Sequence, residues 1–448
     1  MRTTLLSRSV FVLACGLCAA ACSASGAITG AAVEGNSTAG EGSAAGSGPL
    51  GHPGSAGAGG QQVVAIAGAN GNSGGAPSTT FGGSTSAGGK PASGSAGSPG
   101  DSGGSAGSSS PAAGCTPPAT YTNLFVTVSG HTQAESDAKI TAAWSQYFNP
   151  SGANTVYYNG PGADESYVKD VANNDVRTEG QSYGMMIAVQ LDHQTEFDRL
   201  WAFVKNHMLS GKEIAWHTST SGSKLASGGA PDGDEYFAAA LVFASKRWGD
   251  TSGKYNYASE AKTILNLIRT QDFNDKAKLV QFYAGSGNTD GSYVLPAFYQ
   301  SWACFDTENA AFWNSAVTAG RAFFKAAVDS NGVIGDQSSF TGQTQKGAGS
   351  DTVRCVMNIM MDHNFFKADP WQETYASKYG AYVSKGTGST AQLSCNGLLG
   401  FGLPAATGKP FVDKLWSVAM PTGQYRYYDG TLYFLALLHV SGTFHLWY

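Results

Sequence analysis

The sequence is poor in charged residues, which make up 13% of its 448 residues, and its net charge is only -5. No cluster of Lys and Arg with aromatic residues between them occurs along the chain. A nucleic-acid-binding surface needs such a basic footprint. The composition therefore argues against nucleic acid as a partner.

Cysteine is scarce as well, with 7 residues, three of them within the first 22 positions. The other four show no metal-type spacing and no context of a cysteine enzyme, so we expect no metal site, no cofactor and no thiol nucleophile. Their even number in a chain bound for an oxidising compartment allows one or two disulfides, whose pairing the sequence does not give. These four are Cys115, Cys304, Cys355 and Cys395.

Residues 23–114 almost lack aromatic residues and consist largely of Gly, Ser and Ala with scattered Pro. Such a segment cannot bury enough apolar surface to offset its ordering entropy, so we expect a disordered, flexible tether. The composition suits a mere spacer equally well. It also suits a long link between an anchored end and an enzyme that reaches for a polymeric substrate.

Residues 1–22 carry two arginines, then an apolar run too short for a comfortable membrane span, then small residues. This pattern is typical of a secretory signal. Cys22 follows three alanines and is compatible with lipidation as a bacterial lipoprotein, whereas ordinary signal cleavage is the alternative. The segment ending at Cys15 fits the lipoprotein pattern better but leaves a very short apolar run. We expect a secreted or cell-surface protein, with membrane attachment through Cys22 as one form.

No second linker interrupts residues 115–448, and no alternating series of apolar and polar residues recurs there. We therefore expect one monomeric domain that is neither a β-sandwich nor a β/α barrel. Helical spacing of apolar residues predicts a mainly α-helical domain, most economically closed as a toroid. The expected helices span residues 136–147, 182–191, 196–208, 235–247, 257–269, 293–302, 310–328, 351–363, 369–383 and 431–440.

Acidic residues stand at three of these helix starts. Glu179 precedes a buried apolar helix, and Gly180 beside it allows close approach of a ligand. A carboxyl group half surrounded by apolar residues can have the raised pKa that a general acid needs. Asp232 lies three residues before Glu235, which is the spacing of a capping box, and Asp351 is also compatible with a simple helix cap. Capping and catalysis both remain open on spacing alone.

Aromatic residues are frequent near the loop ends. Carboxylates and aromatic faces without a metal signature point to glycoside cleavage, which uses one protonated and one ionised carboxyl group. Core packing is the alternative for each aromatic residue taken singly. The residues concerned are Trp216, Tyr293, Tyr299, Trp302, Tyr425, Tyr427, Tyr428 and Tyr433.

Five segments in this order resemble glycoside hydrolase family 8, and most closely its reducing-end xylose-releasing exo-oligoxylanase branch. They are VKDVANNDVRTEGQSYGMMIAVQLDHQTEFDRLW, APDGDEYFAAALVFASKRWG, SYVLPAFYQSWA, SDTVRCVMNIMMDHNFFKADPWQ and PTGQYRYYDGTLYFLALLHVSGTF. The resemblance extends from Tyr121 to Tyr448. It implies an (α/α)6 barrel with a cleft across the N-terminal ends of its inner helices, and inverting hydrolysis of β-1,4-linked sugars.

The resemblance also implies roles for single residues. Glu179 matches the general acid, Asp351 the general base, and Asp232 the aspartate that holds the sugar in the cleavage subsite. Arg177 and Tyr183 flank the acid as in the family, and Trp216 lies in a segment associated with sugar stacking. The expected substrate-binding residues are Arg177, Tyr183, Trp216, Asp234, Tyr293, Arg354, Tyr425 and Tyr428. Arg354 is expected to orient Asp351 and keep it charged. Arg177 would lower the pKa of Glu179 if it touched it, so we expect it to point at Asp232 or at substrate.

Two departures from the branch widen the expected substrates. Gly349 and Ser350 precede Asp351 where the branch has an aromatic residue, and residues 393–398 lack the histidine of a loop that caps the cleft. Xylan or xylo-oligosaccharides are the expected substrates, with endo-β-1,4-glucanase action as an alternative. A non-catalytic surface carbohydrate-binding protein is a second alternative. A polysaccharide lyase is a third, and its products would absorb in the ultraviolet.

Overall fold

The computed structural model describes residues 115–251 and 253–448, which belong to one compact unit. These residues are mainly helical, so the expectation of a mainly α-helical domain is confirmed. The expected signal at residues 1–22 and the expected tether at residues 23–114 lie outside the described residues.

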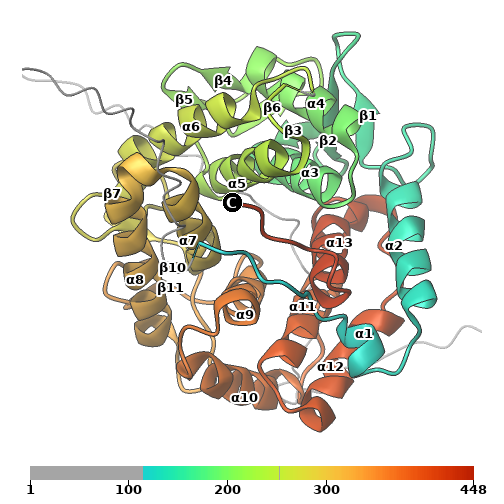
Figure 1. Ribbon diagram of the computed structural model, residues 1–448, viewed down its shortest axis with the longest axis vertical. Helices are drawn as coiled ribbons and strands as arrows, with labels where there is room; N and C mark the ends of the chain where they lie inside the picture. The colour runs from blue at the N-terminus through green and yellow to red at the C-terminus, as the bar shows by residue number, and fades with distance from the viewer. Residues whose placement is uncertain (1–114, 252) are drawn as a thin grey trace, which may run out of the picture. The chain divides into compact units, whose positions relative to one another are not determined.

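The longer helices form two concentric layers (Figure 1). Each inner helix packs on the next, and the last returns to the first, so the inner layer is a closed ring. Its helices are α3 (Thr178–Gln190), α5 (Pro231–Trp248), α7 (Pro296–Phe305), α9 (Val353–Phe366), α11 (Thr390–Asn396) and α13 (Tyr428–Val440). Each outer helix packs on an inner one. The outer helices are α2 (Gln133–Tyr147), α4 (Gln194–Phe203), α6 (Tyr257–Leu267), α8 (Ala310–Ala327), α10 (Trp371–Val383) and α12 (Ala405–Ser417).

The two layers differ because their helices differ in the width of their apolar surface. From Pro231 to Ser245 every residue of α5 is buried, and α3 and α13 are buried almost as completely. A helix that is apolar on all sides must lie inside a protein. By contrast, α8 buries a single stripe that includes Trp313, Ala316, Val317 and Gly320. The width of the apolar surface thus distinguishes the inner helices from the outer helices.

Some helix boundaries differ from the expected ones. Residues 196–208 and 257–269 do not form single α-helices, because α4 and α6 end in π-helical turns, η1 (Val204–Met208) and η2 (Ile268–Asp272). Two helices, α11 and α12, were not predicted from apolar spacing. Glycines follow α11 and a proline lies inside α12, so neither shows an uninterrupted apolar period. Short helices complete the described chain: α1 (Leu124–Thr127), η3 (Gly291–Tyr293), η4 (Thr307–Asn309), η5 (Gly397–Phe401) and η6 (Gly423–Arg426).

Short antiparallel strands connect the helices. They were not predicted, because strands of two to five residues are too short to show alternation. The largest sheet has the order β1-β2-β3-β6, formed by Tyr157–Asn159, Ser166–Asp170, Asp175–Arg177 and His217–Ser219. A second has the order β11-β10-β9, formed by Thr344–Lys346, Gln337–Ser339 and Asn288–Thr289. Two hairpins pair β4 (Leu209–Ser210) with β5 (Glu213–Ile214) and β7 (Phe273–Asn274) with β8 (Leu279–Val280).

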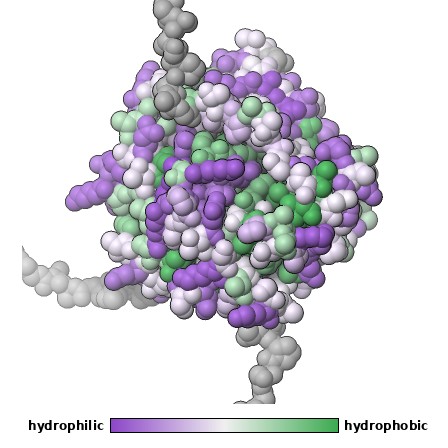
Figure 2. Space-filling model, turned by 60° about the horizontal axis from the view of Figure 1, so that its bottom comes forward, coloured by the Kyte–Doolittle hydropathy of each residue, from purple (hydrophilic) through white to green (hydrophobic). Residues whose placement is uncertain are grey.

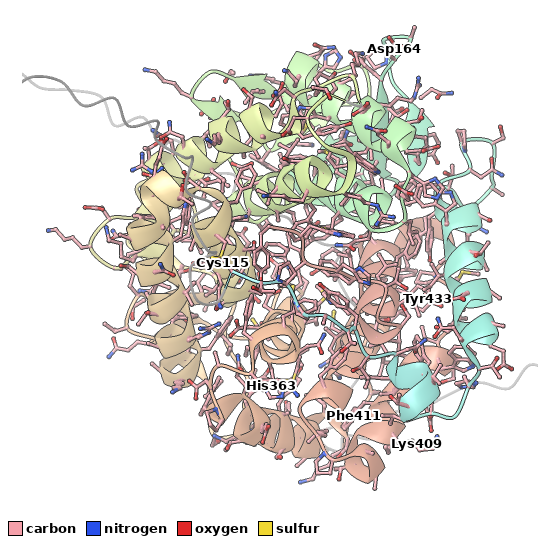
Figure 3. The ribbon with its side chains drawn as sticks, in the orientation of Figure 1. Cys115, Asp164, His363, Lys409, Phe411 and Tyr433 are labelled. Atoms are coloured by element: carbon pink, nitrogen blue, oxygen red, sulfur yellow. A yellow bond between two sulfur atoms is a disulfide. The ribbon has the colours of Figure 1, made fainter. Side chains whose placement is uncertain are left out.

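One disulfide joins Cys115 to Cys304 on α7, across a sequence separation of 189 residues. Figure 3 labels Cys115 at the start of the described chain, and Tyr433 on α13. Cys355 and Cys395 are buried free thiols. Of the one or two disulfides expected, the described residues therefore form one.

The face shown in Figure 2 mixes hydrophilic residues with small groups of hydrophobic ones. Within the described part of the chain, no helix has the length and apolar character needed to cross a membrane.

Candidate active site

A cavity with about 360 Å³ of empty space, partly open to solvent, opens where the N-terminal ends of α3, α5 and α9 meet. Three carboxyl groups line it, together with two arginines and two aromatic rings. The lining residues are Arg177, Thr178, Glu179, Trp216, Ala230, Asp232, Tyr293, Asp351 and Arg354. The structure thus brings together residues that are up to 177 positions apart in the sequence.

A larger hollow of about 1430 Å³ lies beside α10 and α12. It is lined by small and apolar residues and by Lys414, and no carboxyl group is among its lining residues. Acid–base chemistry therefore belongs to the smaller cavity.

Glu179 is held at the first turn of α3, where β3 passes directly into the helix. The backbone N–H of Thr178 donates to the carbonyl of Trp216 at 3.0 Å, which ties this start to the strand beside it. The side chain of Glu179 is 18% exposed, so it faces the cavity from a largely buried position. The hydroxyl of the buried Tyr427 donates to Glu179 Oε2 at 3.3 Å.

The guanidinium of Arg354 connects all three carboxyl groups. Its Nη1 lies 3.1 Å from Glu179 Oε1 and 2.7 Å from Asp232 Oδ2, and its Nη2 lies 3.3 Å from Asp351 Oδ1. Nη1 also donates to the hydroxyl of Tyr183 at 2.9 Å. Arg354 was expected to orient Asp351, and it does contact it. Its contacts with Glu179 and Asp232 were not foreseen.

One cation cannot compensate the three carboxylates around it, of which Asp232 is buried and Glu179 and Asp351 are partly exposed, so the cluster favours bound protons. Burial raises the pKa of Glu179 to about 8; Arg354 opposes this rise, while Asp232 and Asp351 add to it. Burial also raises the pKa of Asp232, against the effect of Arg354. Glu179 is therefore largely protonated at neutral pH, as proton donation requires.

Asp351 lies across the guanidinium from Glu179. Both carboxyl groups contact that one group, at 3.1 and 3.3 Å. The two oxygens that contact it are therefore less than about 9.5 Å apart. This is the upper limit of the roughly 6.5–9.5 Å separation of carboxyl groups in inverting glycosidases. The hydroxyl of Tyr428 reaches Asp351 Oδ1 at 3.4 Å and donates to the carbonyl of Ser350 at 3.0 Å.

Asp336 shapes the turn that carries Asp351, and sequence reasoning missed it. Its Oδ1 accepts hydrogen bonds from Gly349 N at 2.9 Å and from Thr352 Oγ1 at 2.8 Å. A Cβ at position 349 would lie 2.1 Å from Asp336 Oδ2, so any other residue there would displace the carboxylate of Asp336. This contact explains why glycine stands at position 349, close to the base. No local pattern marks Asp336, because its partners lie 13 and 16 residues further on.

Arg177 was expected to point at Asp232 or at substrate. It lines the cavity, but it does not contact Asp232. Its guanidinium instead binds Asp170 at 3.3 Å and Asp175 at 3.1 Å. The antiparallel pairing of β2 with β3 places both aspartates within its reach. It also lies over the indole ring of Trp216, 5.8 Å from the ring centroid.

The other expected substrate-binding residues differ in whether they reach the cavity. Trp216 and Tyr293 line the cavity, and Tyr428 reaches it through Asp351. Tyr425 is 58% exposed and is not a lining residue, so its contact with substrate stays a prediction. Tyr183 is buried, and its hydroxyl meets Arg354 rather than the cavity.

The prediction that Asp234 binds substrate is corrected by its burial, since its side chain has no exposed surface to offer. Neither of its carboxyl oxygens has a hydrogen-bond partner among the described residues. Burial, and then the nearby Asp272, raises the pKa of Asp234 well above its usual range. Among the other aromatic residues, Tyr299, Trp302 and Tyr433 are completely buried, as the core-packing alternative held.

The capping alternatives are wrong. Asp232 and Glu235 form no capping box, because Ala230 occupies the cap position of α5 without a capping side chain and Glu235 Oε1 accepts from the hydroxyl of Tyr299. Asp232 Oδ1 accepts from Gly233 N beside it in the first turn. No side chain caps the start of α9 either. Asp232 and Asp351 instead line the cavity and contact Arg354.

The expected approach of a ligand to Gly180 is corrected as well. A Cβ there would lie 2.2 Å from the ring of Tyr427, so the space beside Gly180 is filled by that ring. Tyr427 also accepts a hydrogen bond from Gly180 N at 3.1 Å. Within the described chain, no group of three His, Cys, Asp or Glu residues has an arrangement able to hold a metal ion.

Comparisons with known proteins agree on one family. The family model described as "Glycosyl hydrolases family 8" matches residues 119–442. The reducing-end xylose-releasing exo-oligoxylanase Rex8A of Paenibacillus barcinonensis is 32% identical over 370 residues, which cover 73% of this chain and 97% of that enzyme. Endoglucanase 2 of Ruminiclostridium josui is 28% identical over 354 residues, covering 73% and 76% of the two chains.

Solved structures give the same result. The structure of Rex8A complexed with xylose superposes with a TM-score of 0.69 at 32% identity, covering 73% of this chain and 98% of that one. A variant of Rex8A complexed with 3(3)-alpha-L-arabinofuranosyl-xylotetraose matches with a TM-score of 0.69 at 30% identity, covering 73% and 97%.

Proposed function

This chain belongs to glycosyl hydrolase family 8, and from that premise we propose that it hydrolyses β-1,4-linked xylo-oligosaccharides or xylan with inversion at the anomeric carbon. The observation that carries the proposal is the cavity in which Glu179, Asp232 and Asp351 share the guanidinium of Arg354. The double ring of helices supports the assignment as an (α/α)6 barrel with its cleft at the N-terminal ends of the inner helices.

In the proposed reaction, Glu179 is the general acid and donates its proton to the leaving glycosidic oxygen. Its raised pKa, about 8, keeps that proton bound at neutral pH. Asp351 is the general base and takes a proton from a water molecule that attacks the opposite face of the sugar. Arg354 binds both groups, so their relative position is set before substrate arrives.

Asp232 and the aromatic rings provide sugar binding in this proposal. Asp232 lines the cavity with acid and base and holds hydroxyl groups of the sugar in the cleavage subsite. Trp216 lines the cavity and is partly exposed, so the C–H face of a pyranose ring can stack on it. Tyr293 lines the cavity too but is buried, so it offers little ring surface. Arg177 offers N–H donors to the same ligand from the cavity wall.

The relatives and the fold together suggest the substrate. The exo-oligoxylanase Rex8A is more similar to this chain than the endoglucanase is, which supports xylose-based substrates. Residues 393–398 form the end of α11 and the start of η5, and all but Leu393 are buried. They form no loop that could cap the cavity. Cleavage inside xylan, or inside a β-1,4-glucan, is therefore the second candidate.

Incubation with xylohexaose and, in parallel, with cellohexaose tests the proposal. We expect xylohexaose to be cleaved faster, with the α-anomer as the first product by proton NMR, and with kcat/KM falling above about pH 8, the pKa of Glu179. Faster cleavage of cellohexaose would favour the endoglucanase alternative. Binding without cleavage, unchanged in the Glu179→Ala variant, would identify a carbohydrate-binding protein instead.

We further propose that the enzyme is a monomer exported by residues 1–22 and held at the cell surface through Cys22. The support is the sequence pattern of that segment. Mass spectrometry of the mature N-terminus should find a lipid on Cys22, and the Cys22→Ala variant should leave the membrane fraction. A soluble, unlipidated mature chain would show ordinary signal cleavage.

A further inference from the structure

Arg177 occupies an unfavourable place for a cation. It ends β3 two residues before Glu179, and its guanidinium lies in the wall of the same cavity. A permanent positive charge near a general acid favours the ionised carboxylate and so opposes proton donation. An uncompensated arginine at this position would work against the reaction.

Two buried carboxylates face this arginine. Asp170 and Asp175 are directly opposite each other in the β2–β3 pair, an arrangement that destabilises a sheet when both are charged and unpaired. Arg177 lies between them, with Nη2 3.3 Å from Asp170 and Nε 3.1 Å from Asp175. The turn that follows Asp170 fixes its carboxylate, whose Oδ1 accepts from the backbone N–H groups of Ala172 and Asn173.

His217 extends the group on the β6 side. It stands opposite Arg177 in the β3–β6 register, and its Nε2 lies 2.8 Å from Asp175 Oδ2. Its ring stacks on that of Trp216 with a centroid distance of 4.6 Å. Trp216 is therefore supported by His217 and by the guanidinium of Arg177.

We propose that Asp170 and Asp175 form a charge clamp on Arg177, which lets this cation line the cavity and support Trp216 while the general acid keeps its proton. Asp170, Asp175 and His217 are positioning residues in this account, since none of them lines the cavity. The inference rests on the proposed function, because that function assigns the acid role to Glu179.

The surroundings of Glu179 agree with the charge clamp. The charged groups that act on its carboxyl are Arg354 and Asp351 from the α9 side, Asp232 from α5 and Arg177 from β3, and Tyr427 adds its hydroxyl from the start of α13. Arg177 acts on the same carboxyl in the direction that lowers its pKa, and this is the effect that the two aspartates of the charge clamp oppose.

The Asp175→Asn and Asp170→Asn variants test the charge clamp through the pH dependence of kcat/KM on xylohexaose. Each should move the alkaline limb to lower pH by about one unit, because Arg177 then acts on Glu179 without compensation. Adding Arg177→Gln to Asp175→Asn should return the limb to its wild-type position. Asp362→Asn is the matched control, since Asp362 is a buried partner of Arg321 at 2.7 Å, outside the cavity, and its loss should leave the limb in place.

An alkaline limb that stays at the wild-type pH in both aspartate variants would overturn the inference and leave them a structural role only. A limb that moves but is not restored by Arg177→Gln would overturn it too. If the wild type cleaves neither oligosaccharide, the proposed function fails, and the charge clamp is then tested by carboxyl carbon NMR, with Glu179 assigned by comparison with Glu179→Gln. A pKa of Glu179 that is lower in Asp175→Asn supports the charge clamp, and an unchanged pKa overturns it.

Discussion

At the scale of single residues, Arg354 decides what the carboxyl groups around it can do. Its guanidinium contacts Glu179, Asp232 and Asp351, so one positive charge is shared among three acids. A buried carboxyl group that is incompletely compensated binds a proton instead of ionising. Glu179 has a pKa of about 8, so a proton is held where the leaving group is expected to lie.

Because Glu179 and Asp351 have different roles, their variants should respond differently to a substrate with an acidic leaving group. Glu179→Gln and Asp351→Asn should each lower kcat on xylohexaose by about 10²–10⁴-fold. An aryl xyloside with an acidic phenol needs no proton donor, so it should restore much of the rate to Glu179→Gln. The rate of Asp351→Asn should stay low, because the water still lacks its base. Equal rescue of both variants would contradict these assignments.

Gly180 offers a second prediction at this scale. Alanine there would place its Cβ 2.2 Å from the ring of Tyr427, which must then move away from Glu179. We expect Gly180→Ala to lower kcat by about tenfold or more, since misplacement of a catalytic group is costly. Gly184→Ala on the same helix is the control. Its Cβ would meet Val168 at 2.6 Å, so it should lower the melting temperature while kcat changes little.

At the scale of elements, the segment before α9 positions the base from outside the helix. Asp336, next to β10, accepts hydrogen bonds from Gly349 and Thr352 on both sides of Asp351. The base is thus fixed by a contact between two connecting segments. A helix cap, which the sequence left open for Asp351, would have acted within one turn.

Asp336→Ala should therefore reduce kcat by about 10–100-fold with little change in KM, because the sugar-binding residues stand on other elements. Steady-state kinetics on xylohexaose measures the two constants separately. Asp329→Ala is the control: Asp329 holds a turn in the same α8–β10 connection through Asn331 N and Val333 N, but lies outside the cavity. A loss of kcat in both variants would mean that the whole connection, rather than Asp336, controls the base.

At the scale of the whole molecule, the number of buried acids sets the response to pH. Burial raises the pKa of Asp234, Glu235, Asp272 and Asp290, in addition to Glu179 and Asp232. The pKa values of Glu179 and Asp272 reach about 8. Between the pH at which carboxyl groups of an unfolded chain titrate and about pH 8, the folded state therefore binds more protons than the unfolded chain.

It follows that the free energy of unfolding falls as pH rises. The stability that these acids contribute is complete below their ordinary pKa values and is lost as pH rises through the folded values. Below the ordinary histidine range, buried His439 acts in the opposite direction, because burial lowers its pKa to about 3. Circular dichroism should show the highest melting temperature in the mildly acidic range and a decrease toward about pH 9, and Glu179→Gln should reduce that decrease. A melting temperature that rises toward pH 9 would contradict this account.

Features that depend on neighbours along the chain could be predicted from the residues alone. Apolar spacing within α5 and α13 marks buried helices, and the segments around Glu179, Asp232 and Asp351 identify the family. These signals are local, because a helix repeats every few residues and a motif is read in one stretch. The helices α11 and α12 were not predicted, because glycines and a proline interrupt their apolar period.

The pairing of charged groups, by contrast, depends on the folded arrangement of distant segments. Arg354 reaches Glu179 across 175 positions, and Cys115 pairs with Cys304 across 189. Arg177 turned to the two aspartates of its own sheet, because the β2–β3 register places them beside it. Such partners are set by closure of the helical ring and by strand register, neither of which leaves a trace in local residue spacing.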